Sequence, residues 1–173
     1  MEPCNGVPGF IPRAIGELKV DALARQYGQW HAGLEPVPER ITAANIERLS
    51  GFDFVFVSVD DGPSGLHIVD WLSARGIPYV DCGMGLDRSV VGLSGFVRVA
   101  GTDRKAFDDN VNSARLPVEN AKINEYRKQT QIAEFNALNA AMAVIRVKQH
   151  FKVLDRLNEA SSNIFDSGTL EID

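Results

Sequence analysis

The sequence predicts one α/β domain built on a partly parallel sheet, with an antiparallel extension of that sheet and a long helix toward the C-terminus. Residues 52–59, FDFVFVSV, and 77–83, IPYVDCG, are apolar runs typical of strands covered on both faces, and a helical segment separates them. Residues 95–101, GFVRVAG, alternate in the period of a half-exposed strand, and residues 126–151 carry a helical apolar stripe. A parallel strand–helix–strand unit followed by an antiparallel strand is the expected arrangement.

The composition indicates a single globular domain spanning residues 1–173. The chain is 45% hydrophobic, and its 23 acidic and 18 basic residues are scattered and give a net charge of −5. Because no basic run is present, neither nucleic acid nor an anionic membrane is expected as the main partner. No apolar stretch approaches the roughly 20 residues of a membrane span. The N-terminus shows no secretory signal, so we expect a cytoplasmic protein.

The N-terminal third holds several short predicted elements. The first 16 residues contain three prolines and three glycines and are expected to form an irregular arm. Apolar residues recur every three or four positions over 17–27, which predicts a helix. Residues 34–41 hold two prolines and suit an edge strand. Thr42 is then expected to cap a helix that carries Ile46 and Leu49.

The remaining segments complete the predicted sheet. The helix between the two apolar strands is expected over 64–75 and ends at Gly76, and such a crossover makes its flanking strands parallel. Residues 83–95 are glycine-rich, and the polar stretch 103–124 is expected to form a loop. The tail reads as two short strands joined by a turn at 166–168.

Cysteine and histidine spacing argues against a zinc site and against a disulfide framework. Cys4 and Cys82 have no CxxC spacing, and His31, His67 and His150 lie in unrelated segments. At the end of an apolar strand, Cys82 is more typical of a small buried hydrophobe than of a nucleophile.

Two adjacent carboxylates are the first candidate site. Asp60 and Asp61 directly follow a buried strand, where open α/β sheets place ligands. Such a pair could hold Mg²⁺ bound to a nucleotide triphosphate, since magnesium typically takes one or two carboxylates plus phosphate oxygens. The alternative is that Asp61 caps the helix that begins with Gly-Pro-Ser.

Three basic residues are candidates for phosphate contacts. Lys19 lies in the first turn of a predicted helix, where its charge opposes the helix dipole and is better placed beside an anion. Arg13 and Arg88 could also clamp a phosphate. For all three, a solvated surface charge is the plainer interpretation.

The order of these segments resembles the middle and C-terminal part of the ThiF/MoeB family, which adenylates ubiquitin-like and sulfur-carrier proteins. The matching residues, in chain order, are Gly16, Lys19, Val20, Asp53, Asp60, Asp61, Gly76, Ile77 and Pro78. The segment QIAEFNALNAAMAVIRVKQHF is similar to a bacterial branch of that family. The resemblance covers residues 12–173 and implies an incomplete ThiF-type fold, which is Rossmann-like.

The resemblance implies a site, a reaction and partners. Lys19 would contact the ATP phosphates, and Asp60 would bind magnesium and the phosphates, so both would be catalytic. Asp61, which would also bind the cofactor, stands where the family usually has asparagine. A carrier protein's C-terminal carboxylate would attack the α-phosphorus and release pyrophosphate, and the chain would pair with a second copy or with a homologue.

The chain also departs from the family pattern. No strand followed by a glycine-rich G-x-G-G-x-G loop is present, and Arg13 lies closer to Lys19 than the family's phosphate-binding arginine would. The CxxC zinc pairs are missing, and Cys82 is the one thioester candidate inside the fold, which we disfavour. A truncated adenylyltransferase is therefore the leading interpretation.

Two other interpretations stay open. The chain could be a non-catalytic partner subunit that binds a ubiquitin-like protein, or a catalytic homologue, through a sheet edge left exposed by missing strands. Ranked lowest is a fragment of a dinucleotide-binding oxidoreductase, because its glycine fingerprint is absent. An incomplete fold is expected to expose apolar surface on Phe54, Phe56 and Val69.

Overall fold

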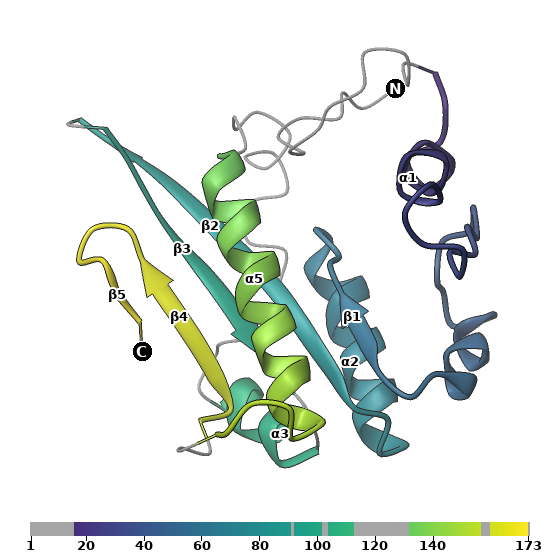
Figure 1. The fold of residues 1–173 in the computed structure, drawn as a ribbon. Coiled ribbons are helices and arrows are strands. Elements are labelled where there is room, and N and C mark those ends of the chain that lie inside the picture. The colour runs from purple at the N-terminus through teal and green to yellow at the C-terminus, as the bar shows by residue number, and fades with distance from the viewer. Residues whose placement is uncertain (1–15, 91, 102–103, 113–131, 157–159, 173) are drawn as a thin grey trace.

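A computed structural model describes residues 16–90, 92–101, 104–112, 132–156 and 160–172. The protein forms an α/β fold on a five-stranded sheet with the order β1-β2-β3-β4-β5 (Figure 1). The strands are β1 (Val55–Val57), β2 (Tyr79–Ser89), β3 (Gly92–Ala100), β4 (Ser162–Asp166) and β5 (Glu171–Ile172). β1 and β2 are parallel and every other pairing is antiparallel. The predicted partly parallel sheet with an antiparallel extension is confirmed.

Helix α2 (Gly62–Ala74) joins the two parallel strands. Asp61 is its N-cap residue and Pro63 lies in its first turn, where the missing backbone donor costs nothing. The chain leaves the helix through Gly76, whose φ of +67° favours glycine. The helix begins two residues before the predicted start because the Gly-Pro pair is itself helical.

Two clusters of buried side chains lie on opposite faces of the sheet. Tyr79 belongs to a cluster with α2 residues such as Val69 and Leu72, whereas its neighbour Val80 belongs to a cluster with Met142 and Ala143 of α5. Successive residues of a strand point to opposite faces. Helix α5 (Ala133–His150) therefore covers one face, while α2 covers the other near β1 (Figure 1).

The β2–β3 hairpin is longer than predicted. The glycine-rich stretch 83–95 is not a separate segment, because β2 continues to Ser89 and β3 begins at Gly92. A Cβ at Gly83 would come within 2.5 Å of the Arg98 guanidinium, and one at Gly85 would collide with the Phe96 ring. These glycines thus let large side chains of β3 lie flat across β2.

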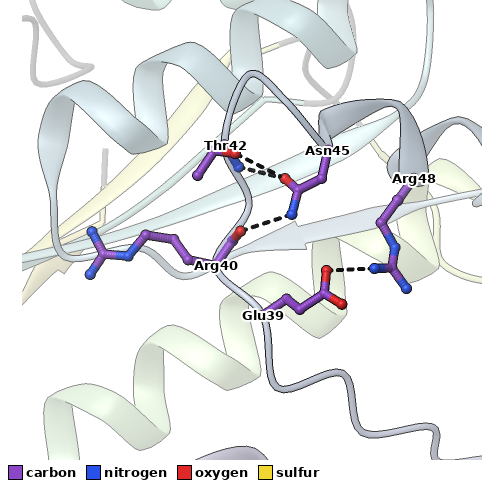
Figure 2. Close-up of polar contacts among 5 residues, drawn as sticks. All are labelled: Glu39, Arg40, Thr42, Asn45 and Arg48. Carbon is purple, nitrogen blue, oxygen red and sulfur yellow. Dashed lines mark hydrogen bonds and ion pairs between the residues drawn. The ribbon is translucent and has the colours of Figure 1, made fainter.

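Two predicted elements in the first third are wrong. Residues 34–41 form no strand, and Thr42 caps no helix (Figure 2). Asn45 organises this turn instead: its side-chain oxygen accepts from the Thr42 backbone N–H at 2.7 Å, and its amide donates to the Arg40 carbonyl at 3.0 Å. A short 3₁₀ helix, Ile46–Gly51, follows and buries Ile46 in the α2 cluster.

The predicted loop 103–124 is wrong where the structure describes it. Residues Arg104–Asn112 form helix α3, and residues 113–124 lie outside the described residues. The helical stripe is weak in sequence, but Phe107 packs into the α2 cluster and the buried Asn110 amide donates to the Ala106 and Ser161 carbonyls. Tertiary contacts stabilise helix α3, which the spacing of its apolar residues does not predict.

Helices α1 and α5 are confirmed with shorter bounds. Helix α1 spans Lys19–Tyr27 and lies apart from the sheet in Figure 1. Helix α5 begins at Ala133, and the predicted first turns, 126–131, lie outside the described residues, as does the arm up to residue 15. None of the described helices is long and apolar enough to cross a membrane.

The C-terminal hairpin is confirmed. β4 and β5 pair through Phe165 with Ile172 and Asp166 with Glu171. The Asp166 carboxylate accepts the backbone N–H of Gly168 at 2.7 Å, as an aspartate-initiated turn requires.

The expected apolar exposure is confirmed in part. Phe56 is 51% exposed, and Phe54 is partly buried against the α5 cluster. Val69 is fully buried, so the expected exposure of α2 is wrong: the helix packs this residue against the sheet.

Candidate functional site

The candidate site lies at the carboxyl end of β1, beside the beginning of β2. β1 ends at Val57, which is level with Asp81 of β2. Asp60 and Asp61 follow within four residues and lead into α2. β1 and β2 are parallel, and open α/β sheets place ligands beyond the carboxyl ends of such strands.

Asp61 is partly buried and organises the start of α2. Its side chain accepts a hydrogen bond from the Ser64 hydroxyl, and its backbone carbonyl accepts from the Gly65 N–H at 2.9 Å. The carboxylate makes no hydrogen bond to a backbone N–H, although Asp61 occupies the N-cap position. Asp61 therefore holds the predicted cap position, but its carboxylate bonds the Ser64 hydroxyl in place of a backbone N–H.

Asp60 is the accessible carboxylate of the pair. Its side chain is exposed and, within the described part of the chain, takes part in no hydrogen bond or ion pair. A free, solvated carboxylate next to an ordered one leaves coordination sites open to a cation.

Lys19 lies on a helix separate from the one that follows the carboxylate pair. It is the first residue of α1, its side chain is exposed, and none of the ion pairs among the described residues joins it to Asp60 or Asp61. Of the other basic candidates, Arg13 lies outside the described residues, and the side chain of Arg88 is among those the structure leaves undescribed.

A buried ion pair that was not predicted from the sequence lies near this end of β1. Arg98 of β3 donates to Asp81 of β2 at 2.6 Å, and both side chains are less than a tenth exposed. Burial raises the pKa of Asp81, and the Arg98 charge offsets part of that rise. The available signal was one charged residue inside each of two strands otherwise made of apolar and small residues, IPYVDCG and GFVRVAG.

Cys82 is an unfavourable nucleophile. It lies on the face covered by α5, and burial raises the pKa of its thiol to about 11, with the hydrogen bond from the Ser58 side chain offsetting part of the rise. The thiolate is the reactive species, so this thiol is almost entirely unreactive at neutral pH. The interpretation of Cys82 as a small buried hydrophobe is the one the environment favours.

The carboxylate pair offers too few ligands for a metal site made of protein groups alone. No group of three His, Cys, Asp or Glu side chains that could hold a metal ion occurs among the described residues. Magnesium bound to a nucleotide needs only one or two carboxylates, because phosphate oxygens and water fill the other positions. Asp60 and Asp61 supply that number.

Comparison with known proteins gives no relative. No protein-family model matches the chain, and no curated protein matches it.

Proposed function

We propose that this chain is the ThiF-like part of an enzyme that uses ATP to adenylate the C-terminal carboxylate of a ubiquitin-like or sulfur-carrier protein. The observation that carries the proposal is the Asp60–Asp61 pair at the carboxyl end of parallel strand β1, with the Asp60 carboxylate open to solvent. The motif order from Gly16 to Pro78 supports the choice of reaction.

In this proposal the two carboxylates have different tasks. Asp60 binds the magnesium ion of the nucleotide, which neutralises phosphate charge when bound. Asp61, held by Ser64, orders the first turn of α2. The free backbone N–H groups of that turn favour an anion nearby.

The reaction requires little covalent chemistry from the protein. A carboxylate oxygen of the carrier protein attacks the α-phosphorus of ATP, a new P–O bond forms, and the bond to pyrophosphate breaks. Rate enhancement then comes from positioning and charge neutralisation. Lys19 is assigned to the phosphates by the resemblance alone.

Calorimetric titration with Mg²⁺ and ATP tests the proposal. We expect saturable binding that weakens at least about tenfold in Asp60→Ala and in Lys19→Ala. Asp155→Ala, which removes an exposed carboxylate after α5, is the matched control and should bind as the wild type does. Absence of saturable binding by the wild-type chain would refute a nucleotide site in it, and an unchanged Asp60→Ala affinity would refute the role of Asp60.

A further inference from the structure

Strand β1 has an unpaired edge. The Val55 N–H donates to the Pro78 carbonyl at 3.0 Å, so the backbone groups of Val55 and Val57 face β2. Backbone groups alternate in direction along a strand, which turns the N–H and C=O of Phe54 and Phe56 outward. Among the described strands, β1 pairs with β2 alone, so these outward groups have no strand partner.

Aromatic side chains lie beside this free edge. The Phe54 ring contacts Phe56, His150 and Phe151, with centroids 5.6, 5.4 and 6.0 Å apart, and we call these four residues the aromatic cluster. Phe56 and Phe151 are 51% and 52% exposed. The cluster sits on the face that α5 partly covers, next to backbone groups that can accept another strand.

The two edges of the sheet differ in protection. Both edge strands are short, with two residues in β5 and three in β1, but β5 includes the charged Glu171, as expected of a strand that avoids pairing. β1 is Val-Phe-Val, without charge, proline or bulge. Its central Phe56 is half-exposed, which is unfavourable for a free edge and suits a covered one.

Negative charge brackets the free edge. Asp53 precedes β1 and Asp60 follows it, both are exposed, and neither forms an ion pair among the described residues. They are separated by seven positions, which span about 23 Å in extended chain. A second copy would bring the same carboxylates against each other, whereas a strand with basic ends would neutralise them.

We propose that β1 docks a strand from a different polypeptide, in which apolar and polar residues alternate and a lysine or arginine stands at each end. Its backbone extends the sheet through the outward groups of Phe54 and Phe56. Its apolar side chains cover the aromatic cluster, and its basic ends lie against Asp53 and Asp60. Binding at this interface needs no nucleotide, but it shares Asp60 with the proposed magnesium site, so a bound magnesium nucleotide and the basic end of the strand compete for that carboxylate.

Fluorescence anisotropy with a labelled peptide of about nine residues tests the interface. The peptide alternates valine and threonine between terminal lysines, and the measurement is made without ATP on the whole chain. We expect saturable binding, weakened at least about tenfold by Phe56→Lys, by glutamate in place of both lysines, and by a central proline that removes a backbone donor. Ile172→Lys, an exposed apolar position on the opposite edge strand, is the matched control and should bind normally.

Three results would overturn the proposal. One is no saturable binding of the lysine peptide to the wild-type chain. Another is equal affinity for the lysine, glutamate and proline peptides, which stays decisive if Phe56→Lys fails to fold. The third is a wild-type dimer in analytical ultracentrifugation that Phe56→Lys dissociates and Ile172→Lys does not, because the occupant would then be a second copy.

Discussion

Two buried arginines occupy different electrostatic surroundings in this protein. Arg98 lies in the middle of the sheet and meets the Asp81 carboxylate at 2.6 Å. Arg146 lies near the end of α5, is 3% exposed, and meets no carboxylate within the described chain; its bond is to the Ala160 carbonyl at 2.8 Å. Arg156 donates to the same carbonyl at 2.6 Å, so two like charges converge there.

The difference shows how a carboxylate partner changes the effect of a buried arginine on the stability of the fold. Burial, followed by the charge of Arg156, lowers the pKa of Arg146 to about 10, although the side chain stays charged at neutral pH. Its Nε and Nη1 atoms find no acceptor, whereas Arg98 leaves only Nη1 without one. We infer that Arg98 depends on its partner and that Arg146 is a net cost to stability.

Asp81→Ala should make Arg98 as isolated as Arg146, and this is the largest effect we expect. Removing one member of a buried pair leaves an uncompensated charge, which costs about 3 to 5 kcal/mol. Chemical denaturation of the variant measures the loss, with Asp155→Ala as an exposed-carboxylate control. A loss below about 1 kcal/mol would show that Arg98 does not depend on Asp81.

Gly83→Ala should disturb the Asp81–Arg98 ion pair from the neighbouring position on β2. The new Cβ would lie 2.5 Å from the Arg98 guanidinium, which must move away from Asp81, and we expect a loss of about 1 to 3 kcal/mol. Gly51→Ala, where a Cβ would meet nothing within 4 Å, is the control in the same denaturation experiment. Equal stability of both variants would mean that Arg98 moves without cost.

Arg146→Met should change stability in the opposite direction. The variant removes a buried charge that has no counter-charge among the described residues, and Arg156 still donates to the Ala160 carbonyl, so we expect a gain of about 1 to 2 kcal/mol. Arg98→Met should be destabilising by contrast, because it leaves Asp81 buried alone. Thermal and chemical denaturation of both variants give the two signs, and a destabilised Arg146→Met would contradict the comparison.

The pH dependence of stability gives the smallest effect. Because the pKa of Asp81 is raised in the folded state, the unfolded chain releases this proton first as the pH rises above 3.8. The contribution of Asp81 to the free energy of unfolding therefore falls with rising pH until the folded group also ionises. Relative to Asp81→Asn, the wild type should lose stability as the pH rises above 3.8 in denaturant titrations. A relative gain would show that Arg98 outweighs burial.

Much of the fold could be predicted from local patterns in the sequence. The strand–helix–strand unit through α2 follows from two apolar runs separated by a helical segment, and the final hairpin follows from a turn that starts at Asp166. The position of Asp60 and Asp61 at a strand end followed in the same way. In each case the residues that carry the sequence pattern lie close together in the chain and also form the structural element that the pattern predicts.

Tertiary structure alone decided what depends on residues far apart in the chain. Nothing local pairs Asp81 with Arg98, buries Arg146 beside the Ala160 carbonyl, or makes a helix of Arg104–Asn112. The sequence does not show why glycine is needed at positions 83 and 85 of β2; the side chains of Arg98 and Phe96 from β3 occupy the space that a Cβ would take there. Burial and charge compensation belong to the assembled sheet, because the desolvation of one side chain is set by neighbours that the chain brings together only on folding.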